Sequence, residues 1–137
     1  MWKTEETDDY KRQFRWYEKK KKRELAAVIV NLQTYFTALE VGASPLQITH
    51  RFVHPEPHGV VAIGQDGRGA NLAVTRLYTY PFTISETLFL LTIGGKDTQQ
   101  ADIKQCSYYV AEIQGAYNSD DQIQREGESL GGEKEAL

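Results

Sequence analysis

The sequence contains a single cysteine, Cys106, and no long run of hydrophobic residues. One thiol excludes an internal disulfide, and a chain without disulfides fits a reducing, cytoplasmic compartment. A transmembrane helix needs about 18–20 consecutive apolar residues. Because no such run occurs, the sequence predicts no membrane partner. The first residues, MWKTEETDDYKRQF, are charged from the start, so we do not expect an ordinary secretory signal.

Histidine is also scarce. His50, His54 and His58 recur every four residues, but Pro55 and Pro57 break any helix that would bring them to one face. With one cysteine and no recurring ligand spacing, the sequence predicts neither a metal site nor a cofactor. One of these histidines is a candidate general base if the loop that carries them folds over a sheet.

The net charge of −3 conceals a segregation of charge along the 137 residues. Residues 118–137 hold six acidic and two basic side chains, a balance of −4, which leaves +1 for residues 1–117. Within that body, residues 11–23 contain eight basic side chains and one acidic one. Closely spaced basic side chains bind polyanions because they displace counterions. Two interpretations remain open, a solvated helix junction or an RNA-binding surface formed by Lys19, Lys20, Lys21, Lys22 and Arg23.

Hydrophobic periodicity predicts two helices near the N-terminus. Residues 1–6 are a candidate edge strand, and Thr7 or Asp8 is placed to cap a helix over residues 9–18. A second helix is predicted by one apolar stripe that ends before Gly42, formed by Leu25, Val28, Ile29, Leu32, Phe36 and Leu39.

Three strands and a last helix are predicted beyond a proline-rich loop. The strands cover residues 59–63, 72–80 and 86–93, and short links between them favour antiparallel pairing. The strand at 86–93 is apolar on both faces, so we expect it to be central and covered on both sides. A helix follows Gly94-Gly95.

This order of elements is typical of an α+β domain in which helices cover one sheet. We assign the domain to residues 1–116. The remaining acidic segment, residues 117–137, has few apolar residues and no sustained periodicity, which predicts a disordered or loosely helical tail.

Two segments hold candidate catalytic residues. In VTRLYTY, Arg76, Tyr78 and Tyr80 alternate and therefore share one face of a strand. Such a face either packs at the edge of the core or binds a nucleotide, with the guanidinium on phosphate and the rings on bases. In the glycine-rich link GQDGRGAN, Arg68 is either an exposed turn residue or a phosphate clamp.

Three stretches carry a family resemblance: LFLLTIGGKDTQQADIKQC, FRWYEKKKKRELAAVIVNLQTYF and TRLYTY. In these stretches the chain resembles the RelE/ParE superfamily of toxin–antitoxin toxins, especially the addiction-module killer proteins and the phage-related, HigB-like group. The resemblance covers about residues 1–114 in element order and is most specific at residues 88–106. It implies a β-α-α-β-β-β-α fold, with a small antiparallel sheet covered by an N-terminal helical hairpin and a C-terminal helix.

The resemblance implies an antitoxin partner and one of two activities. RelE- and HigB-like toxins cleave mRNA on the ribosome without a metal, whereas ParE-like toxins poison DNA gyrase. In the first case a base deprotonates the 2′-hydroxyl, cations stabilise the phosphorane and an acid protonates the leaving 5′-oxygen. Arg76 matches the family's strand arginine and Lys96 the lysine of its turn, and chemistry adds Tyr78, Tyr80 and Arg68 as catalytic candidates.

One departure from the family keeps a non-catalytic alternative open. The segment GVVAIG lacks the glutamate-leucine-arginine pattern of the family's first long strand. A protein that binds gyrase or another partner without catalysis, or an inactive phage or plasmid accessory protein, is the alternative.

Overall fold

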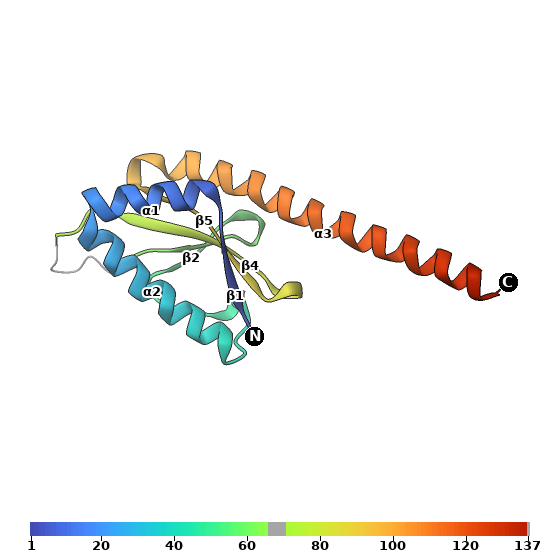
Figure 1. The fold of residues 1–137 in the computed structure, drawn as a ribbon. Coiled ribbons are helices and arrows are strands. Elements are labelled where there is room, and N and C mark those ends of the chain that lie inside the picture. The colour runs from blue at the N-terminus through green and yellow to red at the C-terminus, as the bar shows by residue number, and fades with distance from the viewer. Residues whose placement is uncertain (66–70, 137) are drawn as a thin grey trace.

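The computed structural model describes residues 1–65 and 71–136, with side chains described as far as Ser119. In this part of the chain one sheet of five strands lies between helices on its two faces (Figure 1). The main elements are β1 Lys3–Glu6, α1 Asp8–Lys20, α2 Lys22–Glu40, β2 Val53–Pro55, β3 Val61–Ile63, β4 Thr75–Phe82, β5 Thr87–Gly95 and α3 Gln99–Ala136.

The sheet has the strand order β1-β5-β4-β3-β2. All neighbours are antiparallel except β1, which is parallel to β5. The α+β class is therefore confirmed, but the expectation of a purely antiparallel sheet was wrong. Short links fix the direction only of strands that follow one another, and more than 80 residues separate β1 from its partner Thr87. The second difference is β2, which lies in the segment expected to be a loop.

Thr7 connects the first helix to the sheet. Its hydroxyl oxygen accepts a hydrogen bond from the backbone N–H of Tyr10 at 3.0 Å, which caps α1. The same hydroxyl donates to the backbone carbonyl of Leu91 in β5 at 2.6 Å. Asp8 in the first turn and Lys20 in the last turn are of the sign that the helix dipole favours. Lys21 alone separates α1 from α2, so the basic run forms a tight helical junction, as predicted.

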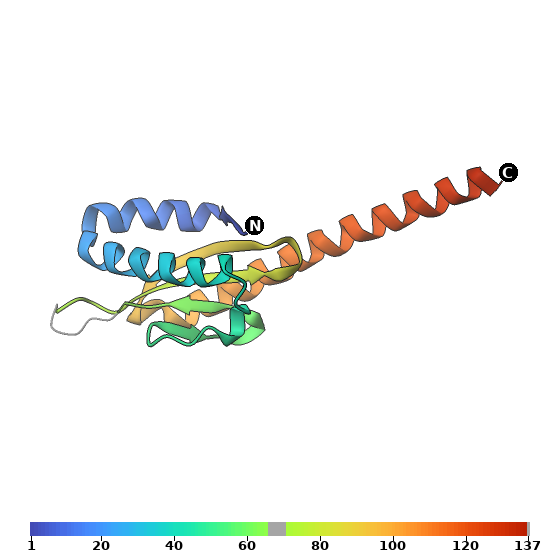
Figure 2. The ribbon, with the colours of Figure 1, turned by 90° about the horizontal axis from the view of Figure 1, so that it is seen from below.

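The helices α1 and α2 cover one face of the sheet and form the larger core (Figure 2). The predicted stripe of α2 faces this core, with Leu25, Val28, Leu32 and Leu39 buried. Burying a leucine or valine side chain stabilises the fold by about 1.5–3 kcal/mol. The hairpin is therefore held mainly by this apolar contact.

The opposite face of the sheet is covered by α3, which forms a second core. Cys106 and Val110 of α3 pack against Ala62 and Leu91 of the sheet. Strand β5 lies between β1 and β4 and contributes side chains to both cores, which confirms the prediction that it is central. The thiol of Cys106 is fully buried, and burial raises its pKa to about 12, so Cys106 is a core residue.

Beyond the sheet, α3 projects away from the body of the protein (Figures 1 and 2). The ring of Tyr117 still contacts Phe82 of β4, with ring centroids 5.4 Å apart. The backbone remains helical to Ala136, through the segment predicted to be a disordered or loosely helical tail. In the residues that the structure describes, no helix combines the length and the apolar character needed to span a membrane.

Candidate functional site

Polar side chains gather on the α3 side of the sheet. The register pairs His54 of β2 with Ala62 of β3, and Ala62 with Tyr78 of β4, so these residues share one face. Arg76 lies two residues before Tyr78 and points from the same side of β4. We call the group the polar cluster, and it consists of His54, Glu56, Arg76, Tyr78 and Asp102.

An ion pair between Arg76 and Glu56 lies at the rim of the polar cluster. Arg76 Nη1 is 3.3 Å from Glu56 Oε1, and the two side chains are 25% and 13% exposed. Glu56 follows β2, and its backbone N–H donates to the carbonyl of Val60 at 2.8 Å, which fixes its position. A guanidinium has five N–H donors in a planar fork. Arg76 is therefore oriented by a carboxylate while it keeps donors suited to a phosphate.

His54 lies beside this ion pair. Partial burial, followed by the positive charge of Arg76, lowers the pKa of His54 below 6.5. Its imidazole is held against the backbone of Gly64, where a Cβ would come within 3.1 Å of Nε2. A histidine with a lowered pKa is neutral near pH 7 and can accept a proton. Strand β2 thus brings one of the three sequence-predicted histidines to the sheet.

The floor of the polar cluster is buried. Asp102 of α3 is 9% exposed and accepts a hydrogen bond from the hydroxyl of Thr98 at 2.8 Å. Burial raises the pKa of Asp102, and the hydrogen bond from Thr98 partly opposes that shift. Tyr78 is fully buried, and its hydroxyl is a buried polar group without a hydrogen-bond partner. Burial, and then the charge of Asp102, raises the pKa of Tyr78.

Tyr78 and Tyr80 do not form the nucleotide-binding surface that the strand pattern suggested. Tyr80 is 7% exposed, and its hydroxyl accepts a hydrogen bond from Gln114 Nε2 of α3 at 2.9 Å. The alternation correctly placed both rings on the face of Arg76. Spacing within one strand, however, does not show that α3 packs on that face, so both rings belong to the second core.

The predicted RNA-binding lysines lie at the end of the sheet where β4 begins and β5 ends (Figure 1). Lys96 directly follows β5 and is exposed. A Cβ on Gly95 would lie 3.9 Å from the hydroxyl of Tyr17, which places the end of α1 beside the end of β5. The exposed residues of the α1–α2 junction at this end are Lys19, Lys20, Lys22 and Arg23, and Lys21 is partly buried.

Arg68 lies outside the described residues, so its predicted role has no structural test. Glu56 and Asp102 are the members of the polar cluster that sequence reasoning missed. Glu56 stands among prolines in a segment read as a loop. Asp102 falls within the first two turns of the predicted helix, where an acid is usually a solvated surface residue.

No family model, no curated protein and no solved structure matches this chain. The interpretation of the polar cluster therefore rests on the chemistry of its own residues. Within residues 1–65 and 71–136, no group of three or more His, Cys, Asp or Glu side chains is arranged to hold a metal ion.

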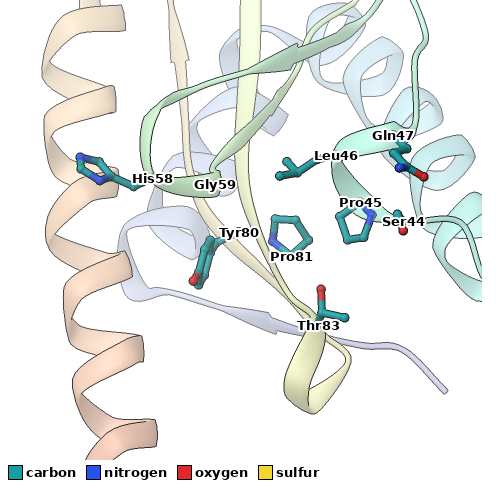
Figure 3. Close-up of a pocket in the computed structure, with 9 residues that line it drawn as sticks. All are labelled: Ser44, Pro45, Leu46, Gln47, His58, Gly59, Tyr80, Pro81 and Thr83. Atoms are coloured by element: carbon teal, nitrogen blue, oxygen red, sulfur yellow. The ribbon is translucent and has the colours of Figure 1, made fainter.

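A cavity of about 350 Å³ lies at the opposite end of β4 (Figure 3). Pro45, Leu46 and Pro81 form its apolar part, and the side chain of His58 points toward α3 rather than into the cavity. No acidic side chain, lysine or arginine is among the described residues that line it. This cavity lacks the charges that phosphate binding requires, whereas the polar cluster has them.

Proposed function

We propose that this protein is a RelE/ParE-like toxin of a toxin–antitoxin module, acting as a metal-independent, ribosome-dependent mRNA endonuclease and neutralised by an antitoxin protein. Three sequence stretches resemble that superfamily. The α+β class, with a helical hairpin on one face of the sheet and a helix on the other, supports the proposal.

The observation that carries the proposal is the Arg76–Glu56 ion pair beside His54. Arg76 binds the scissile phosphate and stabilises the charge that develops on the phosphorane. The neutral imidazole of His54 takes the proton of the attacking 2′-hydroxyl, the P–O5′ bond breaks as the O2′–P bond forms, and water protonates the leaving 5′-oxygen. Glu56 holds the guanidinium in place, so the arginine pays less entropy when the substrate binds.

The basic helical junction supplies the second part of the mechanism. Lys19, Lys20 and Lys22 are exposed at the end of the sheet where Lys96 also lies. Positive charges on one end of a protein bind an RNA backbone without regard to its sequence. In the proposal they position the RNA, and Arg76 and His54 do the chemistry.

Induced expression of the wild type tests the proposal, with primer extension on cellular mRNA as the readout. We expect growth arrest and new cleavage sites, and we expect Arg76→Ala to abolish both. Charge reversal at Lys19, Lys20 and Lys22 should weaken cleavage without moving the sites. Normal growth with intact mRNA would reject the proposal. Growth arrest that survives Arg76→Ala but not the charge reversal, with intact mRNA, would instead favour the non-catalytic alternative, a gyrase-binding protein.

A further inference from the structure

Strand β1 leaves one edge of the sheet open. It is the outermost strand beside β5, and all four of its residues are exposed. The backbone N–H groups of Lys3 and Thr7 donate to carbonyls of Glu86 and Leu90, on the side of β5. Since alternate residues of a strand hydrogen-bond to opposite sides, the N–H and C=O groups of Thr4 and Glu6 point to the open side. No strand in the described part of the chain pairs with that side.

A cavity lies on each side of this open edge. The first, of about 470 Å³, is on the α2 side and is lined by Thr4, Leu32, Gln33, Phe36 and Thr37. Leu32 and Phe36 give it an apolar floor. An apolar side chain entering it would remove apolar surface from water, which is worth about 0.8 kcal/mol for each CH₂ group buried.

The second cavity, of about 310 Å³, lies on the α3 side and is acidic. Glu5, Asp8 and Glu112 line it together with the rings of Phe89 and Tyr109. Lysine and arginine side chains bury an aliphatic stem along apolar surface and keep their charged end in a polar setting. This cavity therefore fits a basic side chain, with the stem on the rings and the charge among the carboxylates.

We propose that the open edge of β1 binds an extended segment of a partner protein in which apolar and basic side chains alternate. Successive side chains of an added strand point to opposite faces of the sheet. The segment would hydrogen-bond to Thr4 and Glu6, send its apolar residues to the α2 side and its basic residues to the α3 side. Charge complementarity selects this occupant over a second copy of the chain, because β1 carries Glu5 and Glu6 against Lys3 and is therefore a net negative strand, which matches the acidic cavity poorly.

The proposal is independent of the RNA-cleavage proposal, since the polar cluster lies across β4 and β2 while β1 borders β5. Fluorescence polarisation of the full chain with the labelled peptide TKVKVKT tests it, with TEVEVET as the matched peptide of opposite charge. We expect TKVKVKT to bind at least tenfold more tightly and to weaken as salt is added.

Two variants locate the binding. Thr4→Pro removes one outward N–H but keeps the bonds to β5, and it should weaken TKVKVKT at least tenfold, whereas Thr4→Ala, which keeps that N–H and changes only the lining of the cavity, should weaken it less. Glu112→Lys, on the exposed surface of α3, should weaken TKVKVKT and strengthen TEVEVET. Amide NMR should show shifts at Thr4 and Glu6 but not at Arg76. Equal affinity for the two peptides, binding insensitive to Thr4→Pro and Glu112→Lys, or a dimer of the free chain formed through β1 would overturn the proposal.

Discussion

The carboxylate of Asp102 lies against the backbone of Gly94, so close that a Cβ on residue 94 would come within 1.8 Å of Asp102 Oδ2. The hydroxyl of Thr98, which donates to this carboxylate, would be 2.6 Å from the same Cβ. Gly94 therefore allows the first turns of α3 to pack directly on β5. This contact gives Gly94 a structural role in addition to its part in the family resemblance.

Gly94→Ala should destabilise the protein by about 1–3 kcal/mol, because the added methyl group collides with the buried side chain of Asp102 and with the hydroxyl of Thr98. Urea unfolding followed by circular dichroism measures the change. In an Asp102→Ala background the same substitution should cost less, since the nearest clashing atom is gone. An equal loss of stability in the two backgrounds would show that the side chain of Asp102 is not what makes a methyl group at position 94 unfavourable.

Asp102→Asn should be more stable than the wild type at pH 7. Burial raises the pKa of Asp102 in the folded state above the unfolded value of 3.8, so the ionised carboxylate opposes folding above that raised pKa. As the pH falls through the raised pKa and below 3.8, the carboxyl is protonated in both states and the difference should disappear. Urea midpoints across this pH range provide the measurement, and a difference that grows toward low pH would contradict it.

Two fully buried tyrosines form a matched pair. Tyr78 has an unpartnered hydroxyl, whereas the hydroxyl of Tyr35 donates to the carbonyl of Pro45 at 3.0 Å. Tyr78→Phe should therefore raise the free energy of unfolding by about 1 kcal/mol, and Tyr35→Phe should lower it by about 1 kcal/mol. Urea unfolding of both variants gives the comparison. A loss of stability in Tyr78→Phe equal to that in Tyr35→Phe would show that the Tyr78 hydroxyl has a partner.

The pKa of His54 should report its contact with Arg76. We expect an NMR titration to place this pKa below 6.5, and Arg76→Gln to raise it, because a neighbouring positive charge is removed. Because folding lowers the pKa of His54, protonation of this imidazole opposes folding. The contribution of His54 to stability is therefore complete above pH 6.5 and is lost as the pH falls through the lowered pKa. The other histidine resonances serve as internal references. An unchanged His54 pKa in Arg76→Gln would show that the charge of Arg76 does not affect His54.

Much of the fold could be predicted from the sequence, because its signals are local. Periodic apolar patterns predicted the burial of two segments, the stripe from Leu25 to Leu39 and the strand before Gly94, and both are buried in the structure. Strand β2 could not be predicted in this way. Its three residues, Val53–Pro55, are shorter than any periodic pattern and stand among prolines, and only pairing with β3 makes them a strand.

The candidate site was predicted less completely, because it is formed by residues distant in sequence. Arg76 was predicted from its strand and its family match, and His54 only as one of three histidines. The ion pair between Arg76 and Glu56 depends on the position of β2, and the burial of Tyr78 depends on where α3 packs. Neither relation has a periodic signature in a single sequence.

The chemistry of the RNA ends tests the central claim most directly. The purified wild type and Arg76→Ala are each added to ribosomes translating a 5′-labelled mRNA, and the termini of the fragments are analysed. Attack by a 2′-hydroxyl leaves a 2′,3′-cyclic phosphate, so we predict such ends with the wild type and none with Arg76→Ala. Intact mRNA with the wild type, or equal cleavage by Arg76→Ala, would contradict the assignment of RNA cleavage to the Arg76 site.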